Sequence, residues 1–97
     1  MSFEVELSSA CYRKLKKMKG QIKERFVSEA SKLSKNPEKG DRLKGKYRKL
    51  RFLHFHFKKV EYRLIYIVDS RKRKVFIVWG GTRENLYKQL NRLQLQI

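Results

Sequence analysis

Residues 62–68 read YRLIYIV, and every position except Arg63 is apolar or aromatic. A strand with apolar side chains on both faces is typical of the centre of a sheet that is covered on both sides. Arg63 is the exception, because burying a charge is costly unless that charge is paired or solvated. Two interpretations follow: a structural ion pair with Glu61 or Asp69, or a cleft at this end of the sheet that holds an anion. We favour the cleft, because further cations are expected to converge on Arg63.

The segments on both sides of this stretch predict a meander of strands. The apolar pattern predicts successive strands at Tyr47–Phe57, Val60–Asp69 and Lys74–Trp79. The expected turns are Lys58-Lys59 and Ser70–Arg73, although neither contains the Asn-Gly or Asp-Gly pair of a tight primed turn. The meander should therefore form an antiparallel sheet.

The first third of the chain predicts one strand and two helices. Apolar residues alternate with glutamates over residues 3–7, as in a half-buried strand. Helical spacing then predicts two helices separated by Gly20, the first capped by Ser8 or Ser9 and the second ended by Pro37. Their apolar stripes are Cys11, Leu15 and Met18 in the first helix, and Ile22, Phe26, Ala30 and Leu33 in the second.

The remaining segments complete the predicted fold. Residues 36–46 contain two glycines and are expected to form a loop, and a last helix should run from Thr82 to about Leu93. The predicted order is β-α-α-β-β-β-α. We therefore expect a single α+β domain over residues 1–97, with a mostly antiparallel four-stranded sheet, an N-terminal helical hairpin and a C-terminal helix.

The charge of the chain predicts a polyanionic partner. Its 26 basic and 9 acidic residues give a net charge of +17 over 97 residues. Residues 42–63 concentrate this excess, since Glu61 is the single acid among nine lysines and arginines. Nucleic acid is the first candidate partner, an acidic protein the second and an anionic membrane surface the third. A merely solubilising basic surface is the alternative without function.

Several classes of protein and site are not expected. No apolar run approaches the roughly 18 residues of a membrane span, and the N-terminal segment lacks the features of a signal peptide, so we expect a cytoplasmic protein. The single cysteine, Cys11, permits no internal disulfide and is expected to pack on a helix face. The two histidines lack a carboxylate cluster beside them, so we expect no metal site and no cofactor.

The first strand of the meander suggests how cations could gather around Arg63. Its apolar face changes parity between Phe52 and Leu53, and a β-bulge there would restore the pattern. A bulge would place four basic side chains on one face, and a two-residue turn at Lys58-Lys59 would pair two of them with residues of the next strand. The four side chains are Lys49, Arg51, His54 and His56, with His54 opposite Arg63 and His56 opposite Glu61.

A second wall of this site is expected at the end of the last strand. Gly80-Gly81 is expected to end that strand, and Arg83 lies in the first turn of the expected helix, where a cation is unfavourable for the helix itself. A bound phosphate would account for that position, and Tyr87, one turn later, would add a hydroxyl group or a stacking ring. Cleavage of RNA by its own 2′-hydroxyl group suits such a site, since cations stabilise the phosphoryl charge and no metal is needed.

Three segments together resemble toxins of the RelE/ParE superfamily. They are Lys49-Leu50-Arg51, EYRLIY at residues 61–66, and GGTRENLY at residues 80–87. The resemblance implies a type II toxin–antitoxin system, with a cognate antitoxin as partner. Its RelE branch implies metal-free cleavage of mRNA in the ribosomal A site, with the ribosome as the second partner. The catalytic residues implied by this branch are Lys49, Arg51, Arg63, Arg83 and Tyr87.

The resemblance leaves the general base open, because the hairpin here is longer than is common in the family. This longer hairpin carries His54, which could serve as the base. We expect the surrounding cations to contact RNA, namely Lys44, Lys46, Arg48, His56, Lys58 and Lys59. The alternative functions are a ParE-like inhibitor of DNA gyrase without enzymatic activity, and a basic RNA-binding module without activity.

Overall fold

The computed structural model describes residues 2–86, 88 and 89, and it has the expected α+β architecture. No helix in this part of the chain is long and apolar enough to cross a membrane. The elements, in chain order, are β1 (Glu4–Leu7), α1 (Ser9–Lys17), α2 (Gly20–Lys32), β2 (Asp41–Arg42), the 3-10 turn η1 (Gly45–Tyr47), β3 (Arg51–Phe57), β4 (Val60–Asp69), β5 (Lys74–Thr82) and the 3-10 turn η2 (Arg83–Asn85).

The sheet has five strands in the order β1-β5-β4-β3-β2. The pair β1–β5 is parallel and the other three pairs are antiparallel, so the prediction of a mostly antiparallel sheet is confirmed. The predicted number of four strands is wrong, because Asp41–Arg42 adds a short edge strand that pairs with β3. Two residues are too few to leave a period in the sequence. The segment YRLIYIV lies in β4, the middle strand, as predicted.

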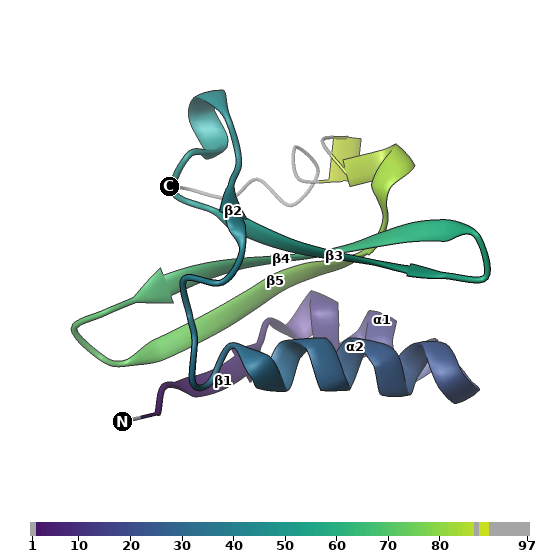
Figure 1. Ribbon diagram of the computed structural model, residues 1–97, viewed down its shortest axis with the longest axis horizontal. Coiled ribbons are helices and arrows are strands. Elements are labelled where there is room, and N and C mark those ends of the chain that lie inside the picture. The colour runs from purple at the N-terminus through teal and green to yellow at the C-terminus, as the bar shows by residue number, and fades with distance from the viewer. Residues whose placement is uncertain (1, 87, 90–97) are drawn as a thin grey trace.

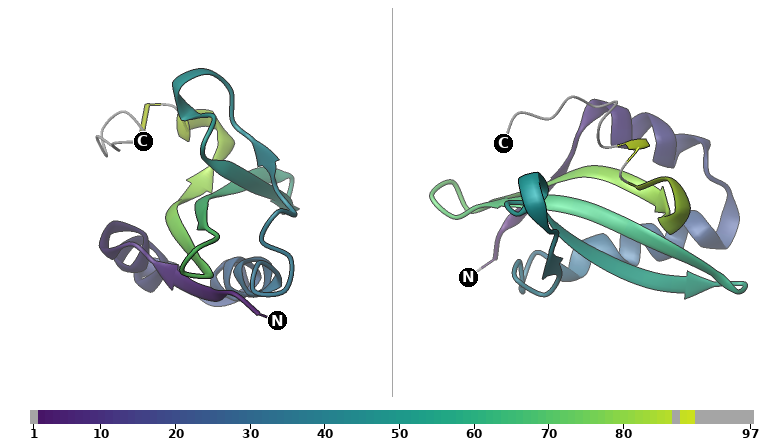
Figure 2. Two further views of the ribbon diagram at one scale, coloured as in Figure 1. Left: turned by 90° about the vertical axis from the view of Figure 1, so that its left-hand side faces the viewer. Right: turned by 90° about the horizontal axis from the view of Figure 1, so that it is seen from above.

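The two helices cover one face of the sheet, and both 3-10 turns lie over the other face (Figures 1 and 2). The predicted cap of α1 is confirmed, since the Ser8 hydroxyl group accepts a hydrogen bond of 3.1 Å from the backbone N–H of Cys11. Gly20 separates the helices, and its φ of 63° is one that other residues adopt only with strain.

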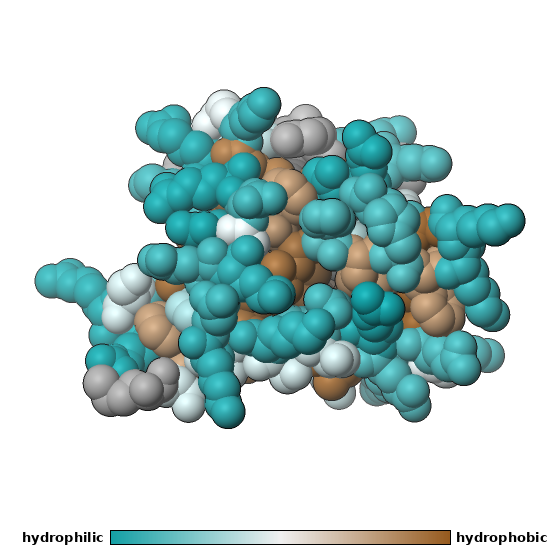
Figure 3. Space-filling view, in the orientation of Figure 1, coloured by the Kyte–Doolittle hydropathy of each residue, from teal (hydrophilic) through white to brown (hydrophobic). Residues whose placement is uncertain are grey.

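In the orientation of Figure 1, hydrophilic residues cover most of the surface, with smaller apolar areas between them (Figure 3).

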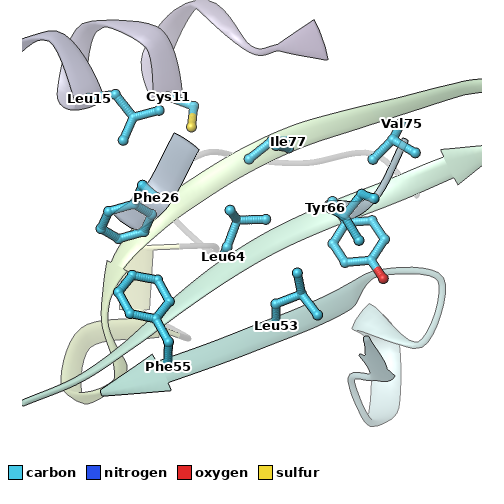
Figure 4. Close-up of a cluster of buried hydrophobic side chains, with 10 residues drawn as sticks. Cys11, Leu15, Phe26, Leu53, Phe55, Leu64, Tyr66, Val75 and Ile77 are labelled. Carbon is cyan, nitrogen blue, oxygen red and sulfur yellow. The ribbon is translucent and has the colours of Figure 1, made fainter. Parts of the chain in front are cut away.

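The helix-covered face holds the larger core cluster (Figure 4). The Phe26 ring of α2 meets the Phe55 ring of β3 edge to face, with centroids 4.9 Å apart. Gly80 of β5 lies directly under Phe26, because a Cβ atom at Gly80 would be 3.1 Å from the phenylalanine ring. The buried members of this cluster are Cys11, Leu15, Phe26, Leu33, Leu53, Phe55, Leu64, Tyr66, Val75 and Ile77.

A second, smaller cluster lies on the opposite face. It is anchored by Ile65 of β4 and Trp79 of β5, and residues of the η1 loop and Leu86 complete it. The buried members are Leu43, Tyr47, Leu50, Ile65, Trp79 and Leu86. Strand β4 is therefore covered on both sides, as its composition predicted.

The bulge predicted between Phe52 and Leu53 is wrong. Strand β3 begins at Arg51, and its pairing with β4 is regular from there to Phe57. The apparent change of parity arises because Phe52 packs against the second cluster, while Leu53 belongs to the first. An irregularity occurs instead in β5, where Val78 has no partner in the register with β4.

Only part of the predicted C-terminal helix lies within the described residues. Arg83–Asn85 form a 3-10 turn, in place of the α-helical first turn that was predicted. Position 87 and positions 90–93 of the expected helix lie outside the described residues. The described positions 86, 88 and 89 are helical, and Leu86 is buried in the second cluster.

Candidate phosphate-binding site

The turn between β3 and β4 sets the register of the site. Lys58 and Lys59 have φ values of 50° and 68°, so both central residues of this two-residue turn are left-handed. That conformation matches the type I′ hairpin turn, which normally uses Asn-Gly. The register places His56 opposite Glu61 and His54 opposite Arg63, as predicted. Arg63 is in turn opposite Gly81 of β5.

Glu61 is the centre of a charged cluster on the face opposite the helices. The Arg63 Nε–H donates a hydrogen bond of 3.0 Å to Glu61 Oε2. The other carboxylate oxygen lies 3.9 Å from Arg83 Nη1 and 3.7 Å from His56 Nε2. Basic side chains from β3, β4 and η2 thus converge on one carboxylate. The ion pair between Arg63 and Glu61, one of the two interpretations of Arg63, is present.

Arg63 is held from two directions. Its guanidinium group lies over the Phe52 ring, 4.5 Å from the ring centroid, while its Nε atom is bonded to Glu61. Its side chain is 18% exposed, against 64% for Arg83. Arg63 is therefore the fixed cation of the pair, and Arg83 is the accessible one.

The cations keep Glu61 ionised. The hydrogen bond from Arg63 holds the pKa of the Glu61 carboxyl group below its usual value of 4.5, and the charges of Arg63, Arg83 and His54 act in the same direction. A carboxylate with a lowered pKa is a weak proton acceptor at neutral pH. Glu61 is thus poorly suited to act as a general base.

A groove of about 880 Å³ opens beside this cluster. It lies between the β2–η1 segment, the β3–β4 hairpin and the end of β5. Five of its lining residues are cationic and two are acidic, which suits an anionic ligand. The lining residues are Arg42, Leu43, Lys44, Phe52, Lys59, Val60, Glu61, Arg63, Thr82, Arg83, Glu84 and Leu86.

The structure does not bring Lys49 and Arg51 into this cluster. Arg51 points to the other face, where its Nη1 atom donates a hydrogen bond of 2.8 Å to the backbone carbonyl of Gly40. Lys49 precedes β3 in an exposed turn and does not line the groove. The predicted grouping of both residues with Arg63 depended on the bulge, and it is wrong for the same reason.

The other predicted residues fall into three groups. Lys44 and Lys59 line the groove, whereas Lys46, Arg48 and Lys58 are exposed outside it. His54 is exposed beside Arg63 in the register, and His56 contacts Glu61. Tyr87 lies outside the described residues.

Sequence reasoning missed several residues of the groove, among them Arg42 and Glu61. Arg42 lies in the short β2 strand, which left no pattern. Glu61 was considered only as an ion-pair partner, although its spacing of two residues from Arg63 on a strand places both on one face. Among the described residues, no group of three or more His, Cys, Asp or Glu residues could hold a metal ion.

Comparison with known proteins identifies the family. A family model described as the ParE-like toxin of type II bacterial toxin–antitoxin systems matches residues 5–91. The chain belongs to this family. No curated protein sequence gives a match.

Solved structures of RelE toxins share the fold of this ParE-like toxin. A RelE mutant from E. coli in the free state superimposes with a TM-score of 0.77 at 18% identity, covering 98% of this chain and 100% of that one. The RelBE2 toxin–antitoxin complex of Mycobacterium tuberculosis gives 0.75 at 24% identity, covering 86% and 100%. The RelE–RelB complex of Pyrococcus horikoshii gives 0.63 at 21% identity, covering 87% and 98%. The fold is therefore RelE-like, within the RelE/ParE toxin superfamily.

Proposed function

We propose that this toxin is a ribosome-dependent endoribonuclease, which cleaves mRNA in the ribosomal A site and so inhibits translation. One observation carries the proposal: Arg63 and Arg83 both line a cationic groove and converge on one carboxylate, that of Glu61. In a complex with RNA, the scissile phosphate would lie at the terminal N–H groups of these two arginines. Such donors stabilise the charge that develops on a phosphoryl group during transfer.

The proposed reaction uses the 2′-hydroxyl group of the RNA as nucleophile. A general base takes the proton from that hydroxyl group, and its oxygen attacks the neighbouring phosphorus atom. The bond to the 5′-oxygen breaks, and an acid protonates that oxygen as it leaves. The products are a 2′,3′-cyclic phosphate and a 5′-hydroxyl end. His54 is our candidate base, because it is exposed and lies directly opposite Arg63.

The proposed partners follow from family and charge. RelE relatives have been crystallised with RelB antitoxins, and we propose that this toxin is neutralised by a cognate antitoxin in the cytoplasm. The cations outside the groove would contact ribosomal RNA, so binding should weaken steeply with salt. We further propose that Tyr87 stacks on or orients the nucleotide, as the family resemblance implies.

The second candidate is inhibition of DNA gyrase without catalysis. It is favoured by the family model, which describes ParE-like toxins. A binder of this kind would need neither the convergence of Arg63 and Arg83 nor the groove beside them. This is why we place it second.

Primer-extension mapping of mRNA on translating ribosomes tests the two candidates. Discrete cuts in the A-site codon, lost in Arg83→Ala, would support the endoribonuclease. Intact mRNA together with inhibited supercoiling by gyrase would support the second candidate and refute the first. Intact mRNA with unaffected gyrase would refute both candidates and leave a basic RNA-binding module without activity.

A further inference from the structure

An acid among the cations that line a groove needs its own explanation. Glu61 repels the phosphate that the groove is proposed to bind, and a neutral residue there would leave more positive charge. Its carboxylate nevertheless contacts Arg63, Arg83 and His56, while its side chain is only 20% exposed. A residue placed at such an electrostatic cost should have a role in the arrangement of the site.

We propose that Glu61 is a positioning residue, which sets the two arginines at the angle and spacing that one phosphodiester requires. This inference rests on the proposed function. The geometry at Arg63 is its first support. Glu61 accepts a hydrogen bond from the Nε–H of that guanidinium group, and the Phe52 ring covers one planar face of the group. The edge formed by the two terminal nitrogens is then left for the ligand, in a single orientation.

The geometry at Arg83 is the second support. Its Nη1 atom lies 3.9 Å from Glu61, beyond a direct hydrogen bond, and its side chain is largely exposed. Attraction to the carboxylate favours positions of this exposed cation near Glu61, without occupying its hydrogen-bond donors. The same carboxylate also offsets the repulsion between the two guanidinium groups. Two arginines and one glutamate leave one net positive charge, which matches one phosphodiester.

Two other roles for Glu61 make different predictions. As a general base it would need a pKa near neutrality, whereas the hydrogen bond from Arg63 lowers the pKa of its carboxyl group. As a competitor, it would occupy the phosphate position until RNA displaced it, and its removal would accelerate the reaction. A positioning role predicts that its removal slows the reaction even though RNA binds as well or better.

The first experiment compares cleavage kinetics on ribosomes for Glu61→Gln and a control. Glu24→Gln is the control, because it makes the same change of charge at an exposed position of α2, away from the groove. We expect Glu61→Gln to lower kcat by about tenfold, with KM unchanged or lower, since small misplacements of reacting groups have effects of this size or more. Glu61→Asp should recover part of the loss, and Glu24→Gln should behave as the wild type. An unchanged or higher kcat in Glu61→Gln would overturn the inference.

The second experiment needs no catalytic activity. In NMR spectra of the free protein, the Arg63 Nε–H signal, assigned with Arg63→Lys, should be resolved and protected from exchange with water. Glu61→Gln should speed this exchange by about tenfold, which is the effect of losing a charge-assisted hydrogen bond of roughly 1.4 kcal/mol or more. Exchange at the wild-type rate would refute the positioning role. If the wild type cleaves no mRNA, the proposed function fails, and this measurement alone decides the role of Glu61.

Discussion

The two faces of the sheet are built from the same strands but serve different ends. On the helix-covered face, Leu64 and Tyr66 of β4 belong to a closed cluster under α1 and α2. On the other face, Ile65 joins a smaller cluster, and Glu61 and Arg63 border an open groove. On β4, Leu64 thus contributes to the closed core and the adjacent Arg63 to the charged site, so substitutions at these two positions should have different effects.

The largest effect is expected from truncation in the closed face. Phe26 is fully buried against Phe55 and Tyr62, so Phe26→Ala should lower the free energy of unfolding by about 3–5 kcal/mol. Urea unfolding followed by circular dichroism measures this change. Val27→Ala is the control, because Val27 is the next residue on α2 but is exposed. Equal losses in the two variants would mean that the helix does not pack as described.

Removal of a cation from the groove face should affect activity more than stability. Arg63→Ala should lower the cleavage rate by about 100-fold to 1,000-fold, the usual result of losing one donor to a transition-state oxyanion. The same variant should lose less stability than Phe26→Ala, because Glu61 remains near Arg83 and partly exposed to water. Ribosomal cleavage assays and urea unfolding on the same samples test both statements. A variant that unfolds as readily as Phe26→Ala would contradict the separation of the two faces.

An intermediate effect is expected at the boundary between the helix-covered core and the β2 edge. The buried Tyr66 hydroxyl group accepts a hydrogen bond of 2.8 Å from the backbone N–H of Gly40. Tyr66→Phe should therefore cost about 1–3 kcal/mol, since it leaves that buried N–H without an acceptor. Chemical unfolding quantifies the loss, and Tyr12→Phe, at an exposed position, should be nearly neutral. Cleavage by Tyr66→Phe at permissive temperature should stay close to normal.

The smallest effects on stability are expected from a change of pH. They concern one carboxylate on each side of the sheet. Glu29 of α2 is buried, which alone raises its pKa, but hydrogen bonds from Lys32 and Arg25 lower it overall. Glu61 also has a lowered pKa, chiefly through its hydrogen bond from Arg63. Both carboxyl groups therefore stabilise the fold above their unfolded pKa, and this contribution is lost as the pH falls through the lower folded values.

Unfolding measured between about pH 3 and pH 6 tests this sign. The free energy of unfolding should decrease below the ordinary carboxyl pKa of 4.5, and the decrease should be shallower in Glu29→Gln and in Glu61→Gln. If the free energy of unfolding of the wild type increased as the pH falls, these ion pairs would not stabilise the folded state.

The features that sequence predicted well are those with a strong period or a fixed length. The apolar composition of YRLIYIV placed β4 in the centre, and the short turn at Lys58-Lys59 placed His54 opposite Arg63. Both follow from local rules, since burial on two faces and turn length act over a few residues. The helical hairpin followed in the same way from its spacing of apolar residues.

The features that sequence missed depend on contacts between distant segments. Phe52 packs on the second cluster, which the sequence did not indicate, and this produced the mistaken bulge and the misplaced Arg51. The two-residue strand β2 exists only because β3 offers it an edge. Whether Arg83 would reach Glu61 depended on the path of the chain after Gly81, and a 3-10 turn replaced the predicted helical start there.

The left-handed turn at Lys58 and Lys59 limits which changes of sequence the hairpin can tolerate during evolution. With two residues in the turn, the parity of β3 relative to β4 is fixed. A single inserted codon would either be absorbed as a bulge beside the turn or slip the hairpin by one position. After such a slip, His54 and His56 would point into the core and Leu53 and Phe55 into the groove. The identities of the turn residues can therefore drift, for example towards Asn-Gly, whereas a change in their number that no bulge absorbs would lose the core and the groove together.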